Sequence, residues 1–147
     1  MTYRLFADYW PKVTEGEEER FARKLNSMPK IVFSRTLDRA PWGTWDEARI
    51  VKNNAADEVV KLKRQSGKDM VIWGSLSLAQ SLMKQGLIDE YRLVVCPIVL
   101  GGGRPLFRDN VGSINVKLQS AKTLDRGAVS LEYIQGGAPG NSSGDKI

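Results

Sequence analysis

Asp69-Met70-Val71-Ile72-Trp73-Gly74-Ser75-Leu76-Ser77-Leu78 is the stretch around which the fold of this chain is organised. Met70–Trp73 predicts a short buried strand, and Gly74 breaks the apolar pattern. Ser75 stands where a helix N-cap belongs, and apolar residues at helical spacing follow it as far as Gly86. A strand that leads through such a turn into a helix places backbone N–H groups at the positive end of a helix dipole, which is typical of a phosphate site. The same pattern is also typical of a plain connector, and the stretch alone leaves both interpretations open.

Length and composition favour an ordinary globular protein. The chain has 147 residues, of which 41% are hydrophobic and 27% charged, and this suits one compact domain with a sizeable core. No apolar run approaches the roughly 18 residues that span a bilayer, and no basic region followed by an apolar one opens the sequence. We therefore expect a cytoplasmic protein with no membrane partner. Cys96, the single cysteine, lies in an apolar pattern and is predicted to be buried.

Charged and catalytic residue types narrow the possible functions. The chain has no histidine, which excludes His-based triads, most zinc sites and the commonest general base near neutral pH, so no metal site is predicted. The net charge of +5 is spread among interleaved acids and bases. Because no basic cluster with interspersed aromatic residues is present, we expect no nucleic-acid partner. Mild positive charge remains compatible with a phosphate-bearing ligand.

Helix signals mark the first part of the chain. Thr2 predicts the start of a helix that runs through Phe6 and that Pro11 ends. Thr14–Glu17 has the capping-box pattern, which predicts a second helix beginning at Thr14 and ending near Met28.

Strand signals follow. Lys30–Ser34 and Ala48–Val51 predict short strands, and Asn54 predicts the cap of a helix from Ala55 to about Gln65. The long apolar run Tyr91–Leu100 predicts a central strand, with a bulge or an edge at Pro97.

The last part of the chain reads as a hairpin and a tail. Val116–Ser120 and Val129–Tyr133 alternate in polarity around a turn at Asp125–Gly127. Residues 136–147 predict a disordered tail. Alternation of strands and helices followed by a hairpin indicates an α/β sandwich with a mostly parallel central sheet and a C-terminal antiparallel hairpin.

The sequence contains three blocks, Val71–Ser75, Gly86–Leu93 and Pro97–Phe107, that match a known family. In their residues and in their order along the chain, these blocks resemble the reductase domain of bacterial riboflavin biosynthesis proteins. Weaker likeness occurs at Asn26–Lys30 and Ser34–Leu37. The chain is similar to the stand-alone branch of that family over residues 1 to about 134. The resemblance implies a dihydrofolate-reductase-like three-layer sandwich, with residues 1–135 as the domain.

The resemblance also implies an activity. Members of such a family transfer a hydride from NADPH to a small substrate, here a heterocyclic or ribitylamino-like compound, and pair as homodimers. The chain would then be an NADPH-dependent oxidoreductase. The alternative is a non-catalytic dinucleotide-binding or dimer-forming module that lacks a complete active site.

Site residues are carried over by position. The cofactor positions comprise the pyrophosphate turn, the strand end beside the adenosine 2′-phosphate and a helix-start threonine; they are Gly74, Ser75 and Leu76, then Ser34, Arg35 and Thr36, then Thr2. Phe6, four residues after Thr2 on one helical face, is expected to line the substrate pocket. Simple capping by Thr2 and Ser34, and a solvated strand end at Arg35, remain alternatives. Asp8 fits a solvated helix carboxylate better than a catalytic acid, so no catalytic residue is assigned.

One departure from the family pattern concerns the start of the chain. The family has Gly-Arg-x-Thr-Tyr where this sequence begins Met1-Thr2-Tyr3. The upstream region that supplies a central strand in relatives is also absent from this sequence. Because an uncovered inner strand edge favours pairing with another chain, we expect either a fragment with a misplaced start or a second copy that fills the gap.

Overall fold

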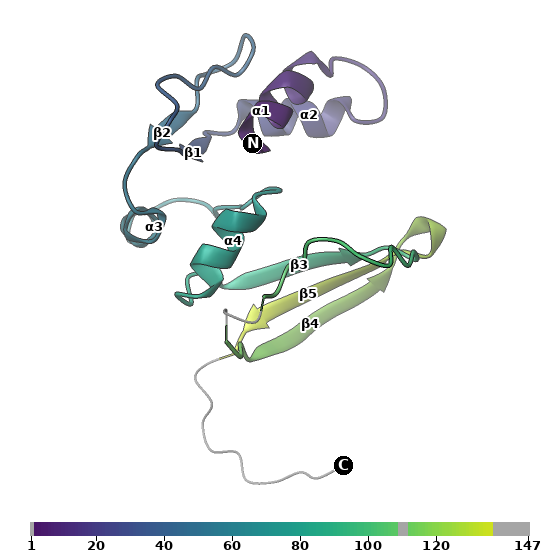
Figure 1. Ribbon diagram of the computed structural model, residues 1–147. Coiled ribbons are helices and arrows are strands. Elements are labelled where there is room, and N and C mark those ends of the chain that lie inside the picture. The colour runs from purple at the N-terminus through teal and green to yellow at the C-terminus, as the bar shows by residue number, and fades with distance from the viewer. Residues whose placement is uncertain (1, 109–111, 137–147) are drawn as a thin grey trace, which may run out of the picture. The chain divides into compact units, whose positions relative to one another are not determined.

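The structure is a computed structural model that describes residues 2–108 and 112–136 (Figure 1). The chain divides into two compact units, of which the first ends at Ser75 and the second begins at Leu76. No helix in the described ranges is long and apolar enough to cross a bilayer. The predicted disordered tail, from residue 137 onward, lies outside the described residues.

Two helices open the first unit. Helix α1 (Thr2–Tyr9) runs into the 3₁₀-helix η1 (Trp10–Lys12), which confirms the predicted first helix with Pro11 at its end. Helix α2 (Glu19–Ser27) begins later than predicted, so the capping box at Thr14 is wrong. The reason is Gly16, whose φ of +86° is left-handed and cannot belong to an α-helix. The end of α2 before Met28 is as predicted.

A small parallel sheet and a third helix follow. Strands β1 (Ile31–Phe33) and β2 (Arg49–Val51) pair in parallel, with Phe33 opposite Val51, and both predicted strands are confirmed. Helix α3 (Ala55–Lys63) has the predicted cap: the Asn54 side chain accepts a hydrogen bond from the Ala56 amide at 2.9 Å. That bond satisfies one of the amides that the first helical turn leaves without an intrahelical acceptor.

A buried amide ties these helices to the loop between β1 and β2. Asn26 on α2 is only 3% exposed. Its Nδ2 donates to the Trp10 carbonyl at 2.9 Å, and its Oδ1 accepts from Trp42 Nε1 at 2.6 Å. Trp42 is itself buried. One side chain thus donates to a backbone carbonyl and gives the buried indole N–H of Trp42 its acceptor.

The second unit holds helix α4 (Leu76–Met83) and an antiparallel sheet of three strands in the order β3-β5-β4. The strands are β3 (Glu90–Val95), β4 (Val116–Thr123) and β5 (Val129–Gln135). Strands β4 and β5 form the predicted hairpin, and the 3₁₀-helix η3 (Asp125–Gly127) is the predicted turn. Figure 1 shows the three strands side by side, with β5 in the middle.

The mixed α/β class is confirmed, but the mostly parallel central sheet is wrong. The described strands form one parallel pair and one antiparallel sheet of three. Met70–Trp73, the predicted buried strand, pairs with no described strand, and Val71 in it is 70% exposed. A hydrophobic run indicates burial or β-propensity without naming a partner, and a strand exists only where a ladder partner lies beside it. The three-layer arrangement of the sandwich stays a prediction.

The predicted central strand Tyr91–Leu100 is also shorter and differently placed. Strand β3 ends at Val95 and lies at an edge of its sheet, because β5 pairs with it on one side only. Pro97 lies beyond the end of β3, in neither a bulge nor an edge of a strand, so that prediction is wrong; its missing N–H cannot extend a ladder. Cys96 lies just past the end of β3 and is exposed, so its predicted burial is wrong.

Candidate functional site

The turn at Gly74 is held closely against helix α1. Thr2 Oγ1 donates a hydrogen bond to the Gly74 carbonyl oxygen at 3.2 Å. Gly74 has a φ of +64°, and a Cβ built on it would lie 3.2 Å from Phe6 Cζ and 3.4 Å from Thr2 Cγ2. The position therefore requires glycine for two reasons, the left-handed backbone and the close approach of α1.

Aromatic rings lead up to this turn from three elements. The Phe6 and Trp10 ring centroids are 6.3 Å apart, and those of Trp10 and Phe21 are 5.0 Å apart. Phe21 then contacts Trp73 at 5.1 Å, immediately before Gly74. These edge and tilted contacts each contribute about 0.5–1.5 kcal/mol beyond the area they bury. The row fixes α1, η1 and α2 around the residues that precede the turn.

The segment after β1 forms a second small turn. Ser34 Oγ accepts from the Thr36 amide at 3.3 Å and from the Leu37 amide at 3.2 Å. The Ser34 amide donates to the Val51 carbonyl at 3.1 Å, which extends the parallel pairing beyond β1. The hydroxyl thus closes a serine turn, as the capping alternative for Ser34 anticipates.

Arg35 follows Ser34, and its side chain is exposed. Within the part of the chain that the structure describes, its exposed side chain has no carboxylate partner. By contrast, Arg39 pairs with Glu47 at 3.1 Å and Arg49 pairs with Glu58 at 2.8 Å. Thr36 is exposed beside Arg35. A guanidinium and a hydroxyl here are accessible to an anionic ligand.

The predicted site residues therefore fall into two groups within the first unit. Thr2 and Phe6 both lie against Gly74, and Ser34 contacts Thr36 through their hydroxyl oxygens at 3.4 Å. Ser75 is half-buried at the end of the first unit. Leu76 opens α4 in the second unit, and the first turn of that helix contains no acidic side chain. An acidic side chain there would repel an anion at this end of the helix, so the absence of acidic side chains from the first turn favours anion binding.

Two charged residues of the first unit, Glu47 and Lys30, serve the fold. Glu47 accepts hydrogen bonds from the Arg39 guanidinium and the Ala40 amide, and both hold the pKa of its carboxyl below the ordinary value. Burial lowers the pKa of the Lys30 ammonium, with Asp46 acting in the opposite direction.

Asn26 and Lys30 are residues that sequence reasoning did not single out. Lys30 Nζ donates to the carbonyls of Asn26 at 2.6 Å and Met28 at 2.7 Å, at the end of α2. It also lies 4.9 Å from the centre of the Trp42 ring. The signal available for both was the weak family likeness at Asn26–Lys30. The contacts indicate that Asn26 and Lys30 have a structural role, in which they connect the end of α2 to Trp42.

Known proteins similar to the chain include two from Bacillus subtilis (strain 168). The uncharacterised protein YyaP is 37% identical over 133 residues, which cover 90% of this chain and 69% of YyaP. The uncharacterised protein YwjB is 30% identical over 90 residues, which cover 61% of this chain and 51% of YwjB. The match thus spans about half the length of YwjB.

A solved structure and a family model identify the family of the chain. The crystal structure of a candidate riboflavin biosynthesis protein from Shewanella sp. PV-4 matches with a TM-score of 0.65 and 28% identity. That match covers 75% of this chain and 62% of the Shewanella chain, which is less than two thirds of its length. The family model of the RibD C-terminal domain matches residues 1–130. The chain, with its mixed α/β fold, therefore belongs to the RibD C-terminal domain family.

Proposed function

We propose that this protein is an NADPH-dependent reductase that transfers a hydride to a small substrate, such as a heterocyclic or ribitylamino-like compound. Membership of a family with a reductase-like fold, whose members generally bind NADPH, supports the proposal. The observation that carries it in this chain is the Gly74 turn, which a left-handed glycine and a threonine hydroxyl shape just before α4. Such a turn lets backbone amides approach a diphosphate closely.

The residues present fit the chemistry of this cofactor. The 2′-phosphate of NADPH is a dianion, and the accessible Arg35 guanidinium and Thr36 hydroxyl are donors of the kind that bind one. The diphosphate needs amide donors and no nearby carboxylate, and the first turn of α4 has no acidic side chain.

When bound, the nicotinamide supplies the hydride. The protein's part is to bind, to orient and to exclude water. In this proposal Arg35 and Thr36 bind the adenosine end, and Gly74–Leu76 bind the diphosphate. Phe6, half-buried against Gly74, lines the substrate side. We assign no proton donor, since Asp8 on α1 is exposed.

The test is cofactor affinity measured by tryptophan fluorescence. The chain has four tryptophans, and Trp73 precedes the proposed turn. The wild-type protein is expected to bind NADPH more tightly than NADH. Arg35→Ala should weaken NADPH about tenfold or more and leave NADH nearly unchanged, because NADH lacks the 2′-phosphate. No binding at millimolar NADPH, or equal losses for both cofactors, contradicts the assignment.

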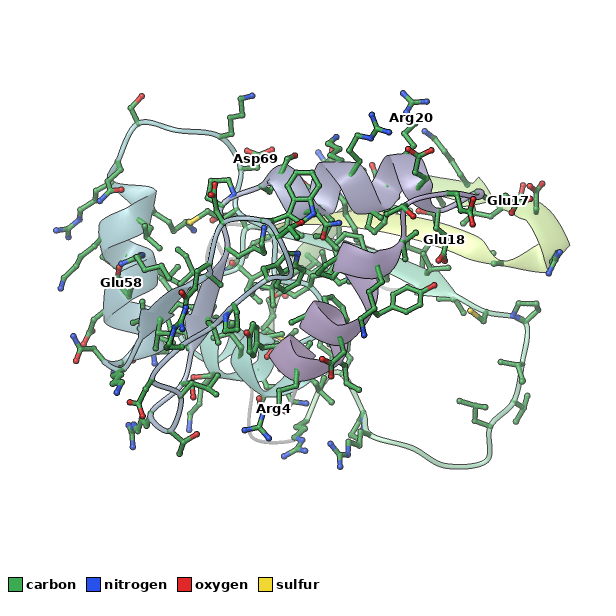
Figure 2. All side chains as sticks on the ribbon, turned by 90° about the horizontal axis from the view of Figure 1, so that it is seen from above. Arg4, Glu17, Glu18, Arg20, Glu58 and Asp69 are labelled. Atoms are coloured by element: carbon green, nitrogen blue, oxygen red, sulfur yellow. The ribbon has the colours of Figure 1, made fainter. Side chains whose placement is uncertain are left out.

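Arg20→Ala is the matched control. Arg20 is an exposed arginine of α2 whose side chain projects from the helix (Figure 2), so its loss changes net charge by the same amount. If Arg20→Ala weakens NADPH as much as Arg35→Ala does, the effect reports overall charge and not a phosphate site.

A second candidate function is a non-catalytic dinucleotide-binding or dimer-forming module. The observation that favours it is the Met70–Trp73 segment, which lies in no described ladder although it leads directly into the proposed turn. NADPH binding without NADPH oxidation on addition of carbonyl or imine substrates would support this alternative.

A homodimer is part of both proposals, with Tyr91–Leu100 and the Gly101–Phe107 loop as the contact between the two copies. Sedimentation of the purified protein tests it.

A further inference from the structure

We propose that Thr2 is a positioning residue, whose hydroxyl holds the Gly74 carbonyl and thereby orients the Ser75 amide toward a diphosphate. The inference rests on the proposed function, since it assigns a role within the same site. It differs from the expectation that Thr2 itself contacts the phosphates. The observation behind it is the 3.2 Å hydrogen bond from Thr2 Oγ1 to Gly74 O, which joins residues 72 positions apart.

The direction of the Ser75 amide follows from the geometry of one peptide group. The Gly74 carbonyl and the Ser75 amide belong to the same planar unit, and the described chain has no cis peptide bond. In a trans peptide the C=O and N–H bonds point in opposite directions. Because the oxygen is bound to Thr2, the Ser75 N–H is directed away from the Thr2 hydroxyl.

The Gly74 turn needs such a restraint. Gly74 has no Cβ and stands at a φ of +64°, so its own sterics restrain the following peptide plane weakly. Phe6 and the Thr2 methyl group close the side on which a Cβ would lie, at 3.2 and 3.4 Å. These contacts restrain the position of the turn, and the Thr2 hydroxyl restrains the orientation of the Gly74 carbonyl.

Thr2 does not donate to the ligand while its hydroxyl is bound to the Gly74 carbonyl. A threonine hydroxyl carries a single proton, and in this structure that proton is directed to the Gly74 carbonyl. The remaining lone pairs of Oγ1 accept hydrogen bonds and repel an anion. Thr2 therefore acts on the ligand through the peptide group and not by touching it.

The experiment compares three variants carrying any purification tag at the C-terminus. Thr2→Val keeps the branched shape and removes the hydroxyl, whereas Thr2→Ser keeps the hydroxyl. Tyr3→Phe is the matched control, because it removes the neighbouring α1 hydroxyl, which donates to the Pro41 carbonyl at 2.6 Å. The probes are NADPH, inorganic pyrophosphate and adenosine 2′-monophosphate, with affinities measured by calorimetry and folding checked by thermal unfolding.

Thr2→Val is expected to weaken NADPH and pyrophosphate about fivefold to tenfold, the effect of losing one well-oriented donor. Adenosine 2′-monophosphate, which has no diphosphate, should bind all variants within twofold of wild type. Thr2→Ser and Tyr3→Phe should bind pyrophosphate as wild type does. If Thr2 acted only through packing, Thr2→Val would keep the pyrophosphate affinity. Loss of affinity in Thr2→Val together with full affinity in Thr2→Ser therefore indicates a role of the hydroxyl.

Other patterns overturn the inference. Unchanged pyrophosphate affinity in Thr2→Val, equal losses in Thr2→Val and Thr2→Ser, or a similar loss in Tyr3→Phe each refute a positioning role. If the wild type binds pyrophosphate but not NADPH, the proposed function fails and the variants still test Thr2 on pyrophosphate. If the wild type binds neither, both proposals fail.

Discussion

Replacing Asn26 by alanine is the most direct test of how the first unit holds together. The Asn26 amide is 3% exposed and bonds to the Trp10 carbonyl at 2.9 Å and to Trp42 Nε1 at 2.6 Å. Alanine removes both bonds and leaves the buried indole N–H without its acceptor. Losing the bond to the Trp10 carbonyl costs about 1 kcal/mol net, and leaving the buried indole N–H of Trp42 without an acceptor costs about 1–3 kcal/mol.

The expected loss in the free energy of unfolding is therefore about 2–4 kcal/mol. That is a large fraction of the roughly 5–15 kcal/mol that stabilises an ordinary domain. The assay is urea unfolding at pH 7, followed by tryptophan fluorescence and by far-UV circular dichroism. The control is Ser27→Ala, the next residue, whose exposed hydroxyl donates to the Lys24 carbonyl at 3.0 Å. Its loss should cost less than about 0.5 kcal/mol.

A double-mutant cycle with Trp42→Phe isolates the bond between the two side chains. Phenylalanine removes the indole N–H, so in that background Asn26→Ala no longer leaves a buried donor without an acceptor. The cycle should show a coupling energy of about 1–2 kcal/mol between Asn26 and Trp42. An Asn26→Ala variant within about 0.5 kcal/mol of wild type, or costs that simply add, would refute the reasoning.

Three further predictions concern backbone and charge. Gly43→Ala should destabilise by clearly more than Gly16→Ala: both glycines have positive φ, but a Cβ on Gly43 would lie 2.6 Å from Pro11 Cβ, whereas a Cβ on Gly16 meets nothing within 4 Å. Equal urea midpoints for the two variants would remove the steric explanation. Asn54→Ala should cost about 1 kcal/mol and reduce helical circular dichroism, because it removes the cap of α3. The carboxyl pKa of Glu47 is lower in the folded protein than its ordinary value of 4.5, so the stability it contributes is present above that value and is lost as the pH falls through the lowered pKa. Glu47→Gln should flatten this acid dependence of the urea midpoint, and an unchanged slope would contradict it.

Local signals predicted the elements that local interactions make. The Asn54 cap, the end of α1 near Pro11 and the hairpin of β4 and β5 all depend on neighbours a few residues away. The capping box at Thr14 failed for an equally local reason, because Gly16 takes a left-handed conformation that the four-residue pattern does not reveal.

The candidate site divides in the same way. The sequence predicted a turn at Gly74 and offered simple capping as one role for Ser34; in the structure Gly74 has a left-handed backbone and the Ser34 hydroxyl accepts from the Leu37 amide. The sequence did not indicate that Thr2 bonds to the Gly74 carbonyl, or that Asn26 joins Trp10 to Trp42. Those contacts link residues 72 and 16 positions apart, and no periodicity reports which distant groups meet.

By itself, the sequence determined the family, the mixed α/β class and most helix and strand positions of this protein, because propensity, capping and alternation act within a few residues. Only the tertiary structure decided how the strands pair. Met70–Trp73 and Tyr91–Leu100 are apolar enough to be central strands, yet the first lies in no described ladder and the second ends at Val95 on a sheet edge. Apolar character indicates that a segment gains by leaving water, but hydrogen-bond register with a distant partner decides whether it becomes a strand and in which direction it pairs.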